Sequence, residues 1–157
     1  EVTAPQFDVD AKFQQQVATL FTAYVEMKDA FVASDADKVK QASGKVETAI
    51  AGIDMSLVTG AAHNDWMMYR QNLTSNIKAI QAAADIEAQR TVFKSFSDDL
   101  YKTIKAYGLG GATAYYEFCP MAFNNTGGYW LSDVAEIRNP YFGDKMLKCG
   151  SVDEELN

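Results

Sequence analysis

Hydrophobic side chains recur every three or four residues along roughly the first hundred positions of the chain, which is the spacing of amphipathic helices. The first helix is expected to begin after Asp8 or Asp10, because an aspartate side chain can cap the free N–H groups of a first helical turn. Ser34-Asp35 interrupts the pattern and provides a cap for a second helix. The apolar positions of the first stretch are Phe13, Val17, Leu20, Tyr24, Met27 and Phe31.

Three further stretches keep the same spacing. We expect Gly60 to end the second helix, Asp85 to cap the fourth, and Gly108 to lie just past the end of the fourth. Helices joined by short loops pack as neighbours, so the pattern predicts an all-α fold, an up-and-down four-helix bundle over residues 7–107. The apolar positions are Val39, Ala42, Val46, Ala49, Ile50 and Ile53, then Trp66, Tyr69, Leu73, Ile77 and Ile80, then Ile86, Phe93, Phe96, Leu100, Ile104 and Tyr107.

Residues 108–157 follow a different pattern, rich in glycine and in large aromatic side chains. The segment Tyr115–Phe118 is aromatic but too short to classify. Asn124–Gly128 and Asn139–Gly143 are typical turn sequences, and we expect the second to fold the chain back on itself. Large aromatic side chains need a surface to cover. We therefore expect an irregular, aromatic-rich C-terminal extension packed on the bundle, and a single domain over residues 1–157.

Length and charge exclude several classes of function. The chain has 157 residues, the size of one domain, and its 21 acidic and 14 basic residues give a formal net charge of −7. Binding to a phosphate backbone needs a clustered excess of lysine and arginine, so we expect no nucleic-acid partner. No run of residues approaches the ~18–20 apolar positions of a membrane span, so we expect no transmembrane segment.

Both cysteines lie in the C-terminal extension, each with a methionine close by. Met121 follows Cys119 by two positions, and Met146 precedes Cys149 by three. Thiolate and thioether sulfurs are soft donors that suit Cu(I) and Ag(I) better than Mg, Ca or Mn. The spacing leaves three interpretations open: a soft-metal site, a Cys119–Cys149 disulfide with methionines as core filler, and two unrelated buried thiols.

The single histidine is a further candidate ligand. His63 precedes Met67 by four positions, so the two share a helix face, and Met55 would lie close to them across the loop before the third helix. The alternatives are a capping or surface histidine and a methionine that fills the core. An enzyme with Cys119 as nucleophile and His63 as base is a separate alternative. No orienting motif accompanies that pair, so we expect no enzyme activity.

Several segments together resemble the domain-of-unknown-function family 3347. The resemblance covers nearly the whole chain. Members of that family are bacterial, and many stand alone behind a secretion or lipoprotein signal, whereas others are fused to periplasmic membrane-fusion subunits of copper and silver efflux systems. The segments are Tyr116–Ala122, Gly128–Ser132, Glu136–Gly143 and Met146–Gly150 in the extension, and Asp54-Met55, His63, Trp66-Met67 and Ile86–Arg90 in the bundle.

The resemblance implies a periplasmic protein or a membrane-anchored lipoprotein, with a signal segment that is absent from this chain. With the soft donors it predicts a Cu(I)- or Ag(I)-binding module accessory to heavy-metal efflux, with copper as its ion and an efflux-pump membrane-fusion protein as partner. The alternative is a structural, protein-interaction domain closed by a Cys119–Cys149 disulfide. An oxidising periplasm favours the disulfide, while Cu(I) binding needs free thiolates, so the two states can alternate with redox conditions.

Both interpretations make the same geometric prediction. Cys119 and Cys149 should converge, with Cα atoms within the ~4.4–6.8 Å that a disulfide bridge spans. Met121 and Met146 should flank the pair, and Trp130 should be packed on the bundle.

Overall fold

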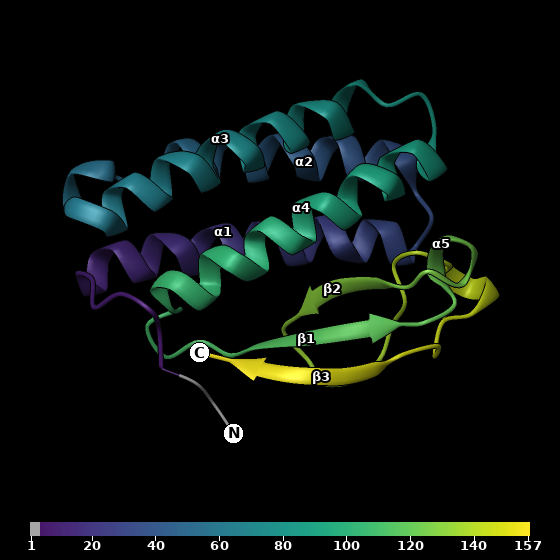
Figure 1. Ribbon diagram of the computed structural model, residues 1–157. Coiled ribbons are helices and arrows are strands. Elements are labelled where there is room, and N and C mark those ends of the chain that lie inside the picture. The colour runs from purple at the N-terminus through teal and green to yellow at the C-terminus, as the bar shows by residue number, and fades with distance from the viewer. Residues whose placement is uncertain (1–3) are drawn as a thin grey trace.

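Four long helices form the first two-thirds of the molecule in the computed structural model, which describes residues 4–157 (Figure 1). They are α1 (Ala11–Val32), α2 (Ala36–Ala51), α3 (Gly60–Ala82) and α4 (Ile86–Tyr107), with a short 3-10 turn, η1 (Met55–Leu57), between α2 and α3. α1 packs against α2, and α3 packs against both α2 and α4. Successive helices run in opposite directions (Figure 1), so the predicted helical bundle is confirmed.

The helix ends follow the predicted capping residues at four places. Three aspartates cap the starts of α1, α2 and α4, and Gly108 follows the end of α4 with a φ of +78°. That left-handed backbone favours glycine, which has no Cβ to clash with the preceding turn. The capping bonds are Lys12 N–H to Asp10 (2.7 Å), Lys38 N–H to Asp35 (3.0 Å) and Ala88 N–H to Asp85 (2.9 Å).

The predicted end of the second helix is wrong. α2 stops at Ala51, and Gly60 is instead the first residue of α3. The segment between them is organised by Asp54, whose carboxylate accepts hydrogen bonds from the backbone N–H and the hydroxyl of Ser56. A side chain that bonds to the backbone two residues on starts a new turn, so the second helix does not continue through this segment.

The C-terminal third is a small antiparallel sheet, so the prediction of an all-α fold with an irregular extension is wrong. Its strands are β1 (Ala114–Cys119), β2 (Gly128–Ser132) and β3 (Ser151–Leu156), in the order β2-β1-β3 (Figure 1). β1 pairs antiparallel with both neighbours. Each strand has only five or six residues, and β3 is held by pairing with a strand more than thirty positions earlier in the chain. Such non-local pairing leaves little periodicity in the local sequence.

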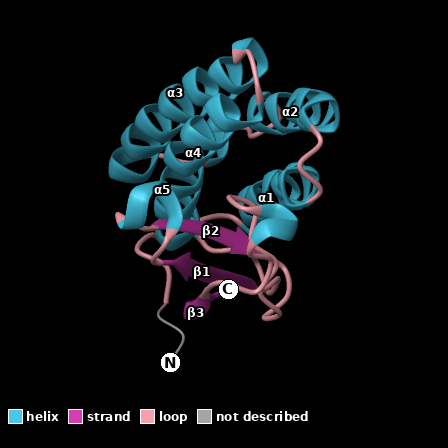
Figure 2. Ribbon diagram, turned by 90° about the vertical axis from the view of Figure 1, so that its right-hand side faces the viewer, coloured by secondary structure: helices cyan, strands magenta, loops and turns pink. Residues whose placement is uncertain are grey.

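The edge strand β2 joins the sheet to the helices. β2 lies against α1 and α4, with β1 and β3 progressively farther from the bundle (Figure 2). Tyr24 of α1 makes the polar link, because its hydroxyl accepts a hydrogen bond from the backbone N–H of Leu131 (3.0 Å) and pairs with the Ser97 hydroxyl (2.7 Å). This buried hydrogen-bonded link fixes the position of β2 relative to α1 and α4.

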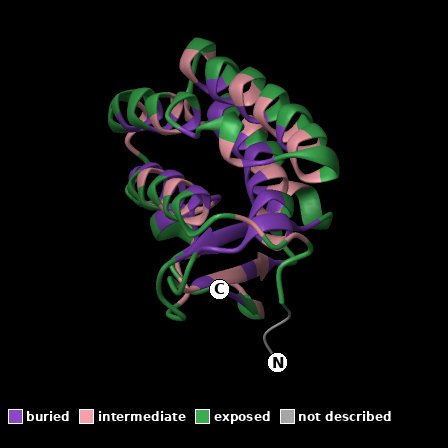
Figure 3. Cartoon of the chain, turned by 90° about the vertical axis from the view of Figure 1, so that its left-hand side faces the viewer, coloured by how far each residue is buried: buried purple, intermediate pink, exposed green. Residues whose placement is uncertain are grey.

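One continuous apolar core runs through helices and sheet. Trp130 of β2 is fully buried, as predicted, and packs edge-on against Tyr141, which packs in turn against Phe93 of α4. The buried surface faces inward between helices and sheet, while the outer helix faces are exposed (Figure 3). Among residues 4–157, no helix is both long and apolar enough to cross a membrane.

Candidate functional site

The two cysteines converge at the end of the sheet. Cys119 is the last residue of β1, and Cys149 lies two positions before β3. The thiol sulfurs are 2.9 Å apart and both cysteines are free, which confirms the predicted convergence. Gly150 makes it feasible: a Cβ at this position would come within 2.9 Å of the Phe118 carbonyl oxygen and of the Trp130 ring. Only glycine lets the segment that carries Cys149 approach β1 so closely.

The two thiols differ in exposure. Cys119 is fully buried, whereas Cys149 is partly exposed. The pKa of the Cys149 thiol is raised, first because the Cys119 thiol shares a hydrogen bond with it and second because of burial, while the backbone N–H of Met121 acts in the opposite sense. Cys149 is therefore the accessible member of the pair, and it keeps its proton at neutral pH until it meets an oxidant or a metal ion.

Asn139 holds the cysteine-bearing segment in place. Its side-chain N–H group donates to the Cys149 carbonyl oxygen (2.8 Å), and its side-chain oxygen accepts from the backbone N–H groups of Tyr141 (2.8 Å) and Phe142 (3.2 Å). Its own backbone N–H donates to the Leu147 carbonyl (2.8 Å). Asn139 is completely buried, so the turn that the sequence predicts at this position folds Cys149 back toward Cys119 through one side chain.

Asn139→Ala is expected to destabilise the protein by about 2–3 kcal/mol, because it leaves buried backbone groups without their partners. Urea unfolding measures this change. The variant should also form the Cys119–Cys149 disulfide more slowly with a mild oxidant, since its cysteine segment is no longer tied to the turn. Asn72→Ala, at an exposed position of α3, is the matched control and should change stability by less than about 0.5 kcal/mol. Equal unfolding midpoints for the two variants would contradict the assignment.

The two methionines near the cysteines line a common cavity of about 560 Å³. Met121 is 46% exposed and Met146 is partly buried. The cavity therefore offers two thioethers, and neither cysteine is among its lining residues. Its polar side chains come from the start of α4 and from the segments that carry the two methionines. The lining residues are Glu87, Arg90, Met121, Ala122, Phe123, Asn124, Asn125, Tyr141, Phe142, Lys145 and Met146.

One wall of this cavity is a strained turn. Phe123, Asn124 and Asn125, in the short helical turn α5 (Ala122–Asn125), have φ values of +54°, +56° and +65°. A left-handed conformation costs a residue with a Cβ about 1–2 kcal/mol, and it is rare for a bulky side chain such as phenylalanine. The Gly127 N–H, which donates to the Ala122 carbonyl (2.9 Å), helps to hold the turn. Strain of this kind is often found where backbone is shaped for a ligand.

A buried carboxyl group lies on the same strand, and the sequence did not reveal it as a site residue. Glu117 precedes Cys119 by two positions, so both lie on one face of β1. It is completely buried, accepts a hydrogen bond from the Trp130 indole (2.8 Å), and its second oxygen has no partner among the described residues. Burial raises its pKa to about 8, although the buried ammonium group of Lys28 opposes the rise. The sequence feature that could have indicated a buried site residue is a single charged residue within an otherwise aromatic segment.

Arg90 is the second residue that sequence reasoning missed. It is buried, and its guanidinium donates to the carbonyl oxygens of Pro140 (2.8 Å) and Phe31 (3.0 Å) and to the Ser34 hydroxyl (3.0 Å). It also forms an ion pair with Glu87 (2.7 Å). The side chain thus ties the cysteine-bearing loop to the end of α1 and the start of α4. The sequence feature that could have indicated its burial is its position three residues before Phe93, on the apolar stripe of α4.

His63 and Met67 do not lie with the cysteines, so the predicted six-residue site is not assembled. The Tyr107 hydroxyl, at the end of α4, donates to the carbonyl of Ala62 beside His63, whereas Arg90 contacts the cysteine loop near the start of α4. Seventeen residues of α-helix separate Arg90 from Tyr107, or about 25 Å at 1.5 Å per residue. Figure 1 places the start of α3 and the end of β1 at opposite ends of the molecule. The Cys119–His63 nucleophile and base pair is likewise not formed.

The donor set at the cysteines is restricted to sulfur. Within residues 4–157 there is no group of three histidine, cysteine, aspartate or glutamate side chains placed to hold a metal ion. Two thiols and neighbouring thioethers suit soft monovalent ions and lack the oxygen ligands that Mg or Ca need. Any metal bound here must therefore be a soft one.

Comparison with known sequences supports the resemblance over the helical part. The model of a family described as "Protein of unknown function (DUF3347)" matches residues 20–111. This range runs from the middle of α1 through α4 and ends before β1, so the cysteine motifs lie outside the matched region. No curated protein and no solved structure shows significant similarity to the chain.

Proposed function

The chain belongs to the DUF3347 family of proteins of unknown function, and we propose that its C-terminal sheet binds a soft monovalent ion, Cu(I) or Ag(I). The observation that carries this proposal is the 2.9 Å approach of two free thiols, brought from positions thirty residues apart. The pair lies at the end of the sheet, where Cys149 is reached from solvent.

Cys119 and Cys149 act as the primary ligands, and the thioethers of Met121 and Met146 complete the site. Metal–thiolate bonds of about 2.3 Å, the length found for zinc, require the sulfurs to lie farther apart than 2.9 Å. Rotation of the partly exposed Cys149 side chain opens that gap, while buried Cys119 stays fixed. Met121 lies next to the opened pair, because its backbone N–H already faces the Cys149 sulfur.

The proposed role is to hold the ion and pass it on. Passing the ion on needs only an exchange of coordinating ligands and no covalent chemistry, so the chain acts as a binding module. A partner can reach the ion through the partly exposed Cys149, and sulfur ligands on such a partner can replace the thioethers of Met121 and Met146 one at a time. We propose a cell-envelope location and a membrane-fusion protein of a heavy-metal efflux pump as that partner.

The same geometry favours a second function, a structural domain closed by a disulfide. A small movement brings the sulfurs from 2.9 Å to the ~2.05 Å of a disulfide bond. The bridge would close a loop of about thirty residues and stabilise the fold by roughly 3–4 kcal/mol. Because the disulfide and the ion need the same sulfurs, oxidation would release the ion, and the two functions would alternate with redox state.

Reduced protein is expected to compete with a Cu(I) chelator for one tightly bound equivalent, and Cys119→Ser/Cys149→Ser should lose at least about 100-fold in affinity at this site, or ~2.7 kcal/mol. Ser151→Ala, an exposed change two positions from Cys149, is the control and should bind as the unchanged protein does. If reduced protein competes no better than the double-serine variant, the ion-binding proposal fails. Intact mass after alkylation tests the alternative: two free thiols in protein handled without reductant would contradict the structural disulfide.

A further inference from the structure

Methionine side chains are unusually exposed at the end of the bundle opposite the cysteines. Met55, Met67 and Met68 are 37%, 36% and 51% exposed, whereas methionine is generally a buried residue. All three lie within fourteen positions of the sequence, around the only histidine of the chain. Exposed thioethers this close in sequence to the imidazole have a chemical use that core packing does not explain.

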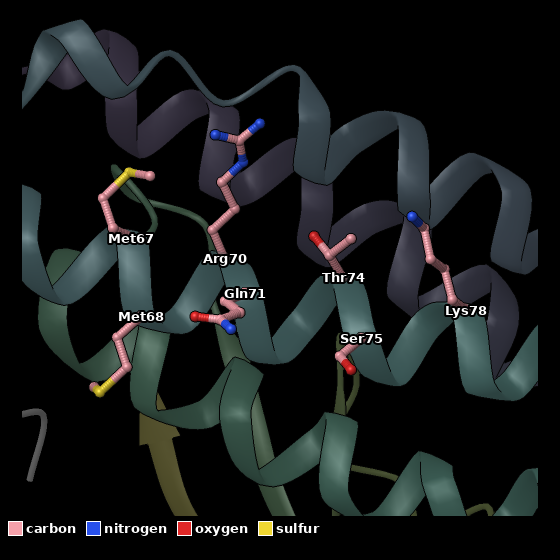
Figure 4. A pocket seen from close by; sticks show the side chains of 7 residues that line it. All are labelled: Met67, Met68, Arg70, Gln71, Thr74, Ser75 and Lys78. Carbon is pink, nitrogen blue, oxygen red and sulfur yellow. The ribbon is translucent and has the colours of Figure 1, made fainter.

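His63 and Met67 lie on the flank of α3 that faces α2. The Gln81 side chain marks this flank, because it donates a hydrogen bond to Glu47 of α2 (3.3 Å). His63 precedes Gln81 by eighteen residues, which is five turns at 3.6 residues per turn, so the two share an angular position. Met67 follows His63 by one turn. Figure 4 shows Met67 and Met68 projecting to opposite sides of α3, so Met68 does not belong to this flank.

Met55 lies in the loop that packs against α3. α2 ends at Ala51, so it does not cover the first turns of α3, and η1 contacts α3 in its place. η1 is held rigidly, because the Asp54 backbone N–H donates to Gln16 of α1 (2.9 Å) while its carboxylate accepts from Ser56. The loop thus places an exposed thioether beside the start of α3, where His63 and Met67 lie.

We propose that His63, Met55 and Met67 form a second soft-ion site, separate from the cysteine pair. One imidazole nitrogen and two thioethers are the donors that Cu(I) and Ag(I) accept and that Mg and Ca do not. The Asp54 carboxylate, adjacent to Met55, adds negative charge to the site. Arg70 follows Met67 by three residues on the same side of α3 (Figure 4), so the site must hold its ion in spite of a positive charge about one helical turn away. The site goes beyond the cysteine site, shares no residue with it, and lies at the opposite end of the molecule (Figure 1).

The single histidine makes a direct test feasible. Ag(I), which is not oxidised by air, is added to Cys119→Ser/Cys149→Ser protein, and the imidazole proton signals of His63 are followed by NMR. These signals are expected to shift and to saturate at one equivalent. Met67→Leu and Met55→Leu should each weaken binding at least about tenfold, and His63→Gln should abolish it. Met68→Leu is the matched control, since it removes a more exposed thioether from the other side of α3, and should leave affinity unchanged.

The outcomes separate the two sites. Reduced, otherwise unchanged protein should bind two equivalents, the double-serine variant one, and the double-serine variant with His63→Gln none. If the His63 signals do not move, or if Met68→Leu weakens binding as much as Met67→Leu, this second site is refuted whatever the cysteines do. If only the equivalent of ion bound by the cysteines is lost, the second site is still supported. Should the double-serine variant fail to fold, the His63 shift is measured in the unchanged protein.

Discussion

Arg90→Met is expected to lower the free energy of unfolding by about 2–4 kcal/mol, because it leaves the buried Pro140 carbonyl oxygen without its donor and leaves the Phe31 carbonyl with only the Ser34 backbone N–H. The guanidinium bonds to the Pro140 carbonyl in the cysteine loop and to the Phe31 carbonyl near the end of α1. Methionine fills similar space but donates no hydrogen bond. The loop and the helix lose their shared polar contact, and the positive charge near the C-terminus of α1 is lost as well.

Urea unfolding measures this loss, with Glu87→Gln as the matched control. Glu87 is the ion-pair partner of Arg90, but its side chain is 73% exposed, so its removal should cost less than about 1 kcal/mol. Arg90→Lys should fall between the two, because it keeps the charge but not the planar set of donors. If Arg90→Met unfolds at the same urea concentration as Glu87→Gln, the buried carbonyl bonds carry no net stability, and the tether between loop and bundle is not made by this residue.

The helical part was predictable because its signals are local. A capping aspartate, an apolar residue every third or fourth position and a terminal glycine all lie within one helix, so Asp85 and Gly108 mark the two ends of α4 correctly. The end of α2 was missed because Asp54 forms its own turn in competition with the helix. That competition depends on a short-range side-chain bond which the apolar pattern does not contain.

The sheet was not predictable from pattern in the same way. β3 reads Ser-Val-Asp-Glu-Glu-Leu, and all but two of its residues are exposed, so it has no apolar alternation. It becomes a strand because β1 offers it hydrogen-bond partners, such as Phe118 for Ser151. Edge strands are often charged, which protects them from pairing with other chains, and this protection removes the sequence signal of a strand.

The candidate site was predictable in part. The turn at Asn139 and the two cysteine segments implied that Cys119 and Cys149 meet, and they do. The sequence could not show that His63 lies at the far end of the bundle, since the direction of α3 relative to the sheet depends on the whole topology. Buried charges are equally hidden, because a charged residue in a sequence normally indicates a solvent-exposed position.

Glu117 should make the protein less stable as pH rises from about 4.5 to about 8. Its pKa is raised from 4.5 to about 8 in the folded protein, so the folded state keeps a proton that the unfolded state releases in this window. Stability falls with pH wherever the folded state binds more protons. At ~1.4 kcal/mol for each pH unit, the loss is on the order of 3–5 kcal/mol, complete near pH 8 and absent below pH 4.5.

Glu117→Gln is expected to remove this pH dependence. The amide stays neutral at every pH and its oxygen still accepts from the Trp130 indole, so the variant should be several kcal/mol more stable than the unchanged protein at pH 8 and close to it at pH 5. Urea unfolding at pH 5, 6.5 and 8 gives the two slopes. Glu136→Gln is the control, because hydrogen bonding to Lys148 lowers the pKa of that exposed carboxyl and takes its titration out of this window.

Parallel pH profiles for Glu117→Gln and the unchanged protein would mean that Glu117 is ionised at neutral pH. The carboxylate would then need a cation, and Lys28 is the buried one whose charge acts on it. Lys28 is already paired with Asp29 at 2.7 Å, and that aspartate is half exposed. Lys28→Met separates the two cases: with a neutral Glu117 it leaves the pH slope in place, whereas with an ionised Glu117 it strands a buried charge and destabilises the protein most at high pH.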